Sequence, residues 1–318
     1  MKKVHCTNTL CFIVLILSLL GDVNPIWAQE GSKNELKFTY LGAAGWQIED
    51  RELLILVDPY ISRLKLGDSP ANSREDKRES FYPTDHYRPD SLMIDKIIKR
   101  ADYILVHHSH VDHLGDVPYI ARKTGAKVIG TQTTSNILRA YGIPESQLLT
   151  VKGGEDYQFD HFSLRVVPSI HSALGNKHYH DSREHWDTAT LRAPLMMKDF
   201  VEGGSLMFLI RLDSHTVLTA GSMNFLEREL AGLNPDILLP GVNLSRLEIY
   251  NYTQRLLSLT GFPKTILPSH WDNFRVPYGH SQEEALEKKI KPFLEEVKAA
   301  SPDSRVIVPV HLKTIVIQ

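Results

Sequence analysis

The sequence predicts a single α/β domain in which two β-sheets pack face to face between outer helices, an αββα sandwich of four layers. Short apolar runs of strand length alternate with amphipathic helical segments along almost the whole chain. No short-period repeat or shift in composition marks an internal domain boundary. The 318 residues, 42% of them hydrophobic, are enough to bury a substantial core.

The first 28 residues are expected to be a secretory signal peptide rather than part of the fold. Lys2 and Lys3 precede an apolar run over Leu10–Leu20, and Ala28 offers a small residue for cleavage. This run is short for a membrane span, which favours a cleaved signal over a retained anchor. We therefore expect a mature domain of residues 29–318, secreted or periplasmic and without membrane association. Both cysteines lie in the signal, so the mature chain has no disulfide and no thiol ligand.

Two strands are predicted at the start of the domain, over Phe38–Leu41 and Leu53–Val57, with Gly42–Gly45 beginning the turn between them. Residues 62–90 are rich in charge and turn formers, and are expected to form a long surface insertion. Its aromatic residues suggest that part of it packs down near the mouth of a site.

The middle of the chain alternates between helix-like and strand-like segments. Helices are predicted over Val117–Lys123, Thr134–Tyr141 and Glu248–Leu257. Strands are predicted over Tyr103–Val106, Ala126–Ile129, Leu148–Val151, Phe162–Val167, Leu206–Leu212, Thr216–Thr219, Ile237–Leu239 and Thr265–Leu267.

The C-terminal region is expected to form a helix and a closing β segment. Ser281 and Glu284 have the spacing of a capping box before an amphipathic helix. Pro292 should kink or break that helix, because proline lacks the N–H that a helix interior requires. Arg305–Ile317 is predicted to supply the closing β segment.

The most informative motif follows the predicted strand Tyr103–Val106. Its spacing, His108-x-His110-x-Asp112-His113, gathers imidazole and carboxylate groups in one polar loop. These are groups that zinc and the neighbouring first-row metals bind. If the backbone stays near-extended, His108 and His110 point to one side and can hold one ion. Asp112 and His113 would then face a second position.

This motif resembles the signature of the metallo-β-lactamase-fold hydrolases. The segments Lys37–Gly42 and Ile55–Pro59 are similar to those of the branch that includes ascorbate-6-phosphate lactonase. The resemblance implies the four-layer αββα sandwich. It also implies that His171 completes the first metal position with His108 and His110.

By the same resemblance, His270 holds the second metal with Asp112 and His113. Asp58 matches the Asp-Pro position of the family, where a carboxylate can orient a ligand imidazole without binding the ion itself. The alternative for Asp58 is an ordinary Asp-Pro turn, and for His171 a loop histidine in a histidine-rich chain.

One position departs from the family pattern. Relatives usually have Ala-Gly-Asp where this chain has Ala220-Gly221-Ser222, and that aspartate bridges the two metals. A hydroxyl is a poor metal ligand beside a carboxylate, so the second position is expected to be weaker. Asn224 and Asp272 are the candidates to compensate for the missing carboxylate.

Residues 172–203 form a second insertion directly after the third predicted ligand. Aromatic residues and histidines are dense and non-periodic there, and include Tyr179 and Trp186. Two interpretations stay open, a cap over the substrate and a solvated loop with a packed tryptophan.

These observations predict a secreted metal-dependent hydrolase that acts on an ester or lactone, amide or phosphoester bond of a small molecule. One or two zinc ions are expected, with manganese and iron as alternatives, and Asp112 would orient the water that the metal activates or shuttle its proton. The near-neutral net charge of −2 argues against a nucleic-acid substrate. Two rivals remain, a non-catalytic binding protein on the same fold and an iron-dependent oxidoreductase. The sequence leaves the substrate and the oligomeric state open.

Overall fold

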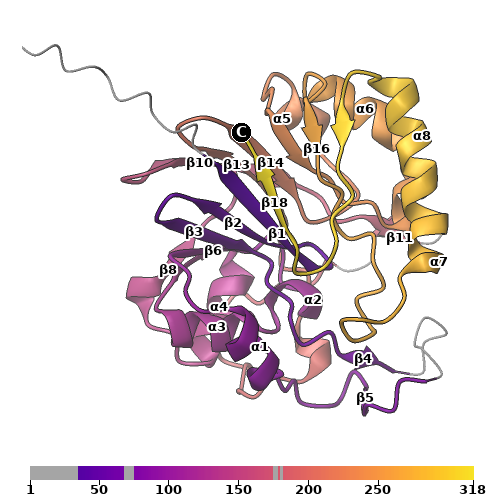
Figure 1. The fold of residues 1–318 in the computed structure, drawn as a ribbon. Coiled ribbons are helices and arrows are strands. Elements are labelled where there is room, and N and C mark those ends of the chain that lie inside the picture. Colours follow the sequence, from indigo (N-terminus) through magenta and orange to yellow (C-terminus); the bar gives the residue numbers. More distant parts are fainter. Residues whose placement is uncertain (1–34, 68–74, 175–177, 180–181) are drawn as a thin grey trace, which may run out of the picture. The chain divides into compact units, whose positions relative to one another are not determined.

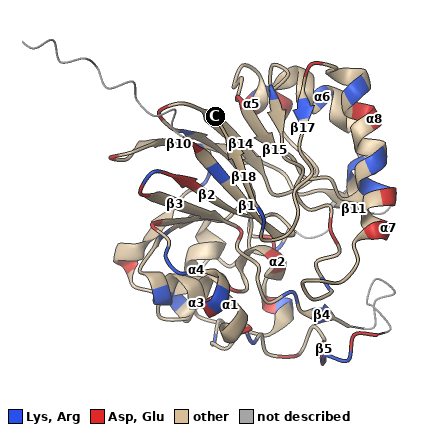
Figure 2. Cartoon of the chain, viewed as in Figure 1, with Lys and Arg blue, Asp and Glu red and all other residues tan. Residues whose placement is uncertain are grey.

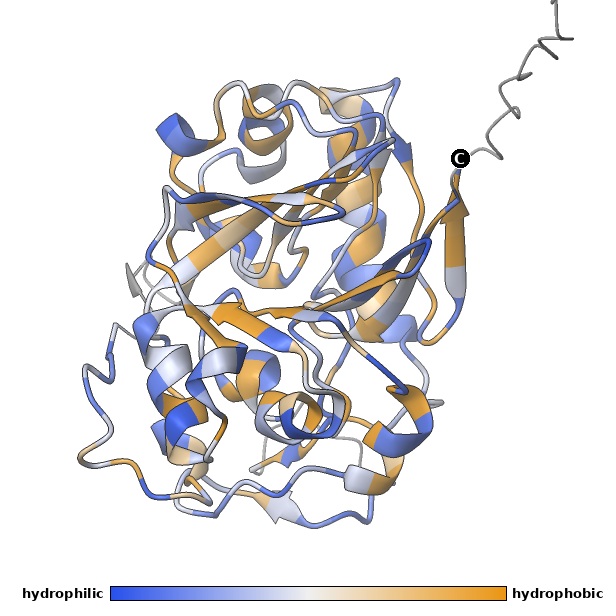
Figure 3. Ribbon diagram, turned by 90° about the vertical axis from the view of Figure 1, so that its left-hand side faces the viewer, coloured by the Kyte–Doolittle hydropathy of each residue, from blue (hydrophilic) through white to orange (hydrophobic). Residues whose placement is uncertain are grey.

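The computed structural model describes residues 35–67, 75–174, 178–179 and 182–318, so the predicted signal peptide lies outside the described residues. In this part of the chain two seven-stranded sheets stack between two layers of helices (Figures 1 and 3). The predicted αββα sandwich is thereby confirmed. Figure 3 shows the most hydrophobic strands at the centre and hydrophilic residues on the outer helices, as burial of apolar surface requires.

The first sheet consists mainly of the N-terminal strands. Its order is β18 (Thr314–Ile317), β1 (Leu36–Gly42), β2 (Gly45–Asp50), β3 (Leu53–Val57), β6 (Tyr103–Leu105), β7 (Lys127–Gly130) and β8 (Leu148–Thr150). Its outer face is covered by α1 (Ser91–Ile97), α3 (Val117–Thr124) and α4 (Gln132–Ala140), which lie together in Figure 1.

The second sheet is built from the C-terminal half of the chain. Its order is β17 (Arg305–Val306), β16 (Thr265–Ile266), β15 (Ile237–Leu239), β14 (Thr216–Ala220), β13 (Ser205–Arg211), β10 (Ser163–Ser169) and β9 (Asp156–Gln158). The helices α5 (Glu227–Leu230), α6 (Tyr252–Leu259) and α8 (Lys291–Ala300) pack on its outer face.

The burial of each strand explains its sequence pattern. In β3, Ile55 faces the core between the sheets, whereas Leu54 and Leu56 face the helices α1, α3 and α4. All five residues of β3 are therefore buried and apolar, as expected of a strand covered on both faces. In β1 the buried residues Leu36 and Phe38 alternate with partly exposed ones, which gives a period of two.

Several short elements lie outside the two large sheets. They include the 3-10 turns η1 (Glu145–Gln147) and η2 (Met197–Asp199), and two short strand pairs, β4 (Lys65–Leu66) with β5 (Ser80–Phe81) and β11 (Ala173–Leu174) with β12 (His178–Tyr179). No helix in the described residues is long and apolar enough to cross a membrane. Figure 2 shows the charged residues gathered on the outer helices, α8 among them, with largely uncharged strands between.

Most predicted elements are confirmed within a few residues, but two predictions at the ends of the domain are wrong. The chain forms a third N-terminal strand, β2, because the turn after β1 ends at Gly45 and the chain pairs antiparallel with both β1 and β3. The closing segment Arg305–Ile317 is not one strand. Its β17 joins the second sheet and its β18 joins the first, so the C-terminus links both layers.

Two helix predictions need correction. The predicted helix Glu248–Leu257 is a 3-10 turn, η3 (Leu244–Glu248), followed by α6. The C-terminal helix begins as α7 (Glu283–Ala285), widens into a π-helical turn over Leu286–Ile290 and continues as α8. Pro292 lies in the first turn of α8, where a missing N–H does least harm, so it marks the change of helix type rather than a break.

Candidate metal centre

Each predicted site residue follows the carboxyl end of a strand. Asp58 follows β3, His108 and His110 follow β6, His171 follows β10, Ser222 follows β14 and His270 follows β16. The motif is not only a loop, because Asp112 and His113 lie on the one-turn helix α2 (Val111–Leu114), which begins directly after His110. The stacked sheets thereby bring segments from both halves of the chain to one edge.

The first predicted group of ligands converges on one point. Ligand nitrogens of His108, His110 and His171 lie within 4.8 Å of one another. The ring centroids are 4.8–4.9 Å apart, and the three rings are nearly perpendicular to each other. Three imidazoles that converge in this way would supply three of the four ligands of a tetrahedral metal site.

His108 itself indicates that a ligand belongs here. Its side chain is 1% exposed, and neither ring nitrogen has a hydrogen-bond partner among the described residues. Leaving a buried polar group unsatisfied costs roughly 1–3 kcal/mol. Burial and the neighbouring imidazoles lower the pKa of His108 well below its ordinary value, so the ring is neutral, as a metal ligand must be. The residues present therefore fit a metal ion.

The second predicted group also converges. Ligand atoms of Asp112, His113 and His270 lie within 4.8 Å of one another. Asp112 Oδ2 is 3.3 Å from His270 Nε2 and 3.7 Å from His113 Nε2. Burial opposes ionisation of Asp112, but the nearby imidazoles outweigh it and lower the pKa of this carboxyl. His270 Nδ1 is buried and has no hydrogen-bond partner in the described part of the chain.

Asp58 lies behind these ligands and contacts two histidines rather than one. Its Oδ2 is 2.6 Å from Nδ1 of His113 and 2.6 Å from Nδ1 of His107, and its Oδ1 accepts the backbone N–H of His107. The bond to Nδ1 leaves Nε2 of His113 facing Asp112 and His270. Burial would raise the pKa of Asp58, but His107 and His113 lower it to about 2.

His107 is the functional neighbour that sequence reasoning missed. Its Nε2 lies 2.9 Å from Thr219 Oγ1, so it connects the motif to β14 of the other sheet. Its position directly before His108 was the available signal, but its role depends on Asp58, which is far away in sequence. Both ring nitrogens of His107 have hydrogen-bond partners, which makes it a support for the ligands rather than a ligand.

Ser222 occupies the predicted bridging position at the edge of the cleft, but its hydroxyl has other partners. Its Oγ accepts the backbone N–H of Ser172 at 2.8 Å and donates to Ser172 Oγ at 3.2 Å. The serine therefore fastens the loop after β14 to the loop that carries His171. It brings no negative charge to the site.

Neither candidate substitute for the bridging carboxylate serves that role in the structure. Asn224 donates from Nδ2 to the carbonyl of His171, and its Oδ1 accepts the N–H of Phe225. It is thus a fastener of the loop that carries His171. The expectation that it compensates for Ser222 finds no support in these contacts.

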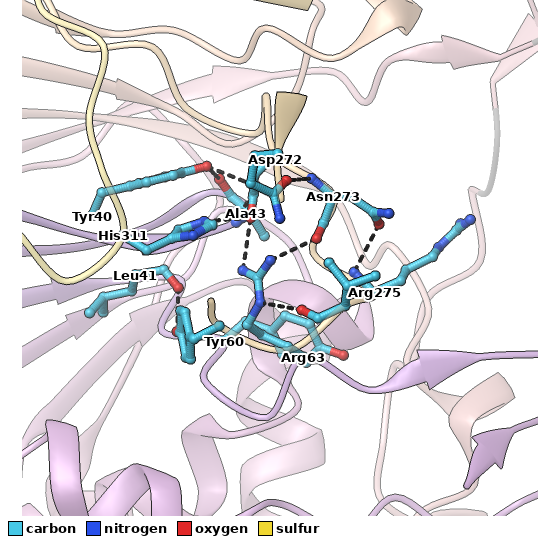
Figure 4. Close-up of polar contacts among 12 residues, drawn as sticks. Tyr40, Leu41, Ala43, Tyr60, Arg63, Asp272, Asn273, Arg275 and His311 are labelled. Carbon is cyan, nitrogen blue, oxygen red and sulfur yellow. Dashed lines mark hydrogen bonds and ion pairs between the residues drawn. The ribbon is translucent and has the colours of Figure 1, made fainter. Parts of the chain in front are cut away.

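Asp272, two residues after His270, belongs to a buried polar cluster. Figure 4 shows its carboxylate among Tyr40, Ala43, Arg63 and His311. Arg63 forms an ion pair with Asp272 at 2.8 Å, and His311 Nε2 lies 2.9 Å away. Burial opposes ionisation, but Arg63 outweighs it and lowers the pKa of Asp272. Each oxygen already has two partners, so Asp272 holds the segment after His270 instead of a metal.

Two residues of the centre have a left-handed backbone, which side chains other than glycine rarely adopt. The φ angles are 40° for Asp58 and 55° for His270. The N–H of His270 donates to the carbonyl of Ala43 at 2.6 Å, which helps hold this conformation. Strain of this kind persists only where the surroundings fix it, and it is common at functional sites.

The ligands line a cleft of about 280 Å³, and both predicted insertions contribute to it. Leu66 lines it from the 62–90 segment and Phe200 from the 172–203 segment. Trp186 is 76% exposed and is not in the lining, and the side chain of Tyr179 lies outside the described part. The packed-tryptophan interpretation is therefore wrong. Because Phe200 lines the cleft, the second insertion still contributes to the cleft wall, and the cap interpretation stays open. In the first insertion, the buried Tyr87 donates its hydroxyl hydrogen to the carboxylate of Asp116, three residues after the motif.

Comparisons with known proteins identify the class that this fold and site define. Residues 37–256 match the family described as the beta-lactamase superfamily domain. The chain therefore belongs to the metallo-β-lactamase superfamily, as the resemblance implied, and its relatives are named metal-dependent hydrolases.

The curated relatives differ in how much of their length the chain covers. It is 26% identical to the UPF0173 metal-dependent hydrolase of Archaeoglobus fulgidus, over 86% of this chain and 95% of the relative. It is 31% identical to the one of Carboxydothermus hydrogenoformans, but over only 43% of this chain and 49% of the relative. The chain thus spans about half the length of some relatives that it matches.

Solved structures show the same fold at low sequence identity. Igni18, a metallo hydrolase from Ignicoccus hospitalis, is 20% identical with a TM-score of 0.57, over 89% of this chain and 99% of that one. CmlA, a diiron β-hydroxylase from Streptomyces venezuelae, is 14% identical with a TM-score of 0.54, over 90% of this chain and 54% of that one. These similarities extend to the fold alone.

Proposed function

We propose that this protein is a hydrolase that uses one or two bound metal ions to cleave an ester or lactone, amide or phosphoester bond of a small molecule. The observation that carries the proposal is the buried His108, whose ring nitrogens lack partners among the described residues while two more imidazoles converge on it. Three converging imidazoles are the ligand set of many catalytic zinc sites.

His108, His110 and His171 would hold the first ion, and Asp112, His113 and His270 the second. Bound there, the metal would supply Lewis-acid polarisation of a carbonyl or phosphoryl oxygen and would lower the pKa of a water molecule. We propose zinc as the natural metal. Manganese and iron bind the same types of donor, so metal analysis of the protein from its natural host is the test.

The chain's own contribution to the chemistry centres on Asp112. Its carboxylate is ionised and 15% exposed, at the start of α2 and in the lining of the cleft. A carboxylate in this place can accept a proton from the attacking water and return it to the leaving group. Asp58 keeps His113 in the tautomer that presents Nε2, and the dense packing around both residues holds this geometry.

A hydrolysis screen with and without metal tests the proposal. The panel contains lactones, esters, amides and phosphodiesters, and compares metal-free, zinc-loaded and manganese-loaded protein with the His110→Ala variant. We expect turnover of at least one bond type in the loaded wild type and none in the variant. Stoichiometric metal without any turnover would favour a binding protein, and turnover only under oxidising conditions with iron would favour an oxidoreductase.

We also propose that the protein is exported and cleaved after residue 28. The support is the pair of lysines, the apolar run Leu10–Leu20 and the small residue Ala28. Mass analysis of the protein from its natural host should find a terminus near Gln29 outside the cytoplasm. An intact Met1 in the cytoplasmic fraction would contradict export.

A further inference from the structure

A second cavity adjoins the metal cleft, and nothing in the proposed chemistry uses it. This side cavity has a volume of about 470 Å³ and lies between η3, residues 272–275 and the start of the C-terminal helix. Asn243, Phe274 and Arg275 line both the side cavity and the cleft. A substrate whose reacting bond lies at the ligands can therefore extend into the side cavity.

The wall of the side cavity contains a lysine with no acidic partner in the described chain. Lys289 lies on the π-helical turn, and its Nζ donates to the backbone carbonyl of Asp272 at 3.2 Å. Burial lowers the pKa of Lys289 to about 8, with Arg275 and Arg246 acting in the same direction and Asp272 opposing them. Because this pKa stays above neutral pH, a partly buried positive charge lies in this wall.

The acidic residues around Lys289 already have cationic partners. Asp272 pairs with Arg63 at 2.8 Å, and Glu284 pairs with Lys288 at 2.6 Å. On the neighbouring helix α8, Glu296 pairs with Arg246 at 2.9 Å. The positive charge of Lys289 is therefore not matched by a carboxylate of its own among these residues, and a bound anion would match it.

A neutral donor complements the lysine. Gln282 also lines the side cavity, and its Oε1 accepts the backbone N–H of Asn273 at 2.7 Å. That bond fixes the orientation of the side-chain amide, and its buried Nε2 has no hydrogen-bond partner in the described residues. Figure 4 shows the side chain of Arg275 extending away from the Asp272–Arg63 cluster, and this residue lines the junction of the two cavities.

We propose that the side cavity binds an anionic group of the substrate, a carboxylate or a phosphate, through Lys289 and Gln282. This inference rests on the proposed hydrolase function and narrows its substrate to small molecules with a negative group several bonds from the one cleaved. Removal of a charged hydrogen-bond partner typically costs about 1.5–3 kcal/mol, a loss in affinity of roughly tenfold to 100-fold.

Matched ester substrates test this specificity in the metal-loaded enzyme. One pair ends in a carboxylate or its neutral methylamide, and a second pair ends in a phosphonate or its neutral dimethyl ester. The wild type should prefer an anionic member by about tenfold or more in kcat/KM, mainly through KM. Which pair shows the larger preference distinguishes carboxylate from phosphate.

Two variants make the test specific. Lys289→Met should bring the ratio of anionic to neutral substrate close to one. The control is Lys291→Met, since Lys291 is an exposed residue of the same helix that pairs with Glu287 and does not line the side cavity. The control should keep the wild-type ratio. A wild type without any preference, or an unchanged ratio in Lys289→Met, would overturn the proposal.

Calorimetric titration with inorganic phosphate and with glutarate supplies a test that needs no turnover. We expect Lys289→Met to lose affinity about tenfold or more and His110→Ala to retain it. The opposite pattern, with affinity lost only in His110→Ala, would place the anion on the metal and contradict the proposal. Anion binding that depends on Lys289, in a protein that cleaves none of the bond types in the hydrolysis screen, would support the side cavity and contradict the hydrolase function.

Discussion

The two predicted metal positions differ in charge and in how their ligands are held. The first consists of three imidazoles, and its central residue His108 has no hydrogen-bond partner on either ring nitrogen among the described residues. The second includes the carboxylate of Asp112, and its His113 is fixed from behind by Asp58. At the place where the family resemblance implies a carboxylate shared by both positions, Ser222 is hydrogen-bonded to Ser172.

This difference shows how one substitution can separate two adjacent sites. A bridging carboxylate brings negative charge to two cations and offsets part of their mutual repulsion, which is strong at such short separation in a buried site. With Ser222 there, the second ion has to bind against the charge of the first, with Asp112 as the one carboxylate among its predicted ligands. We therefore expect the first position to fill before the second.

The largest effect is expected from loss of a ligand at the first position. His110→Ala leaves two imidazoles, and it should abolish stoichiometric binding there together with hydrolysis. Equilibration with a chelator followed by metal analysis measures this. His161→Ala is the control, because His161 is exposed and outside the centre. Full metal content in His110→Ala after the chelator would show that the ligand assignment is wrong.

The next largest effect is expected on the free energy of unfolding, from the buried Asp272 cluster next to His270. Arg63→Met leaves Asp272 as a buried charge without its guanidinium, and breaking such a pair by removing one partner costs about 3–5 kcal/mol. Denaturant unfolding of the metal-free protein should report this loss. Arg255→Met provides the control, because its pair with Glu227 is partly exposed, with side chains 31% and 55% exposed. Equal stability of the two variants would mean that the Asp272 cluster does not hold the segment after His270.

A smaller effect is expected from the carboxylate that supports His113. Asp58→Asn should weaken metal binding at the second position by about 10–100-fold, the usual consequence of losing an outer partner of a ligand histidine. Binding at the first position should change much less. Competition with a zinc-sensitive dye gives both affinities. An equal loss at the two positions would contradict the claim that Asp58 supports mainly the second one.

The smallest effect is expected at the exposed tip of the second insertion. Trp186→Ala should change stability by no more than about 0.5 kcal/mol, because the side chain is 76% exposed. As part of a cap it should raise KM without changing metal content. Steady-state kinetics with any substrate from the screen measures this, and an unchanged KM would show that Trp186 does not contribute to substrate binding.

The sequence was most informative where chemistry and periodicity coincide. Four of the six ligand candidates were predicted from the spacing of the motif, and His171 and His270 from the resemblance to the family. The fold brings both groups of candidates together. The strand β2 was missed because a second turn closely follows the first and Gly45 belongs to both turn and strand. Nothing local shows that β17 and β18 belong to different sheets, since that depends on which edge each strand finds open.

The supporting residues could not be predicted for a similar reason. Asp272 and Arg63 are 209 positions apart, and neither has a local pattern that points to the other. Asp272 could therefore be interpreted as a spare metal ligand, although its oxygens are already occupied. His107 was likewise visible in the motif, but its partners Asp58 and Thr219 come from two different sheets.

Calorimetric titration of the metal-free protein with zinc, with hydrolysis measured at each addition, tests the central claim most directly. Two unequal steps are predicted for the wild type, the tighter one at the position that contains His110. Ser222→Asp should bring the second step closer to the first, because the new carboxylate restores the missing charge between the two ions. Two equally tight ions in the wild type, unchanged in Ser222→Asp, would contradict the account.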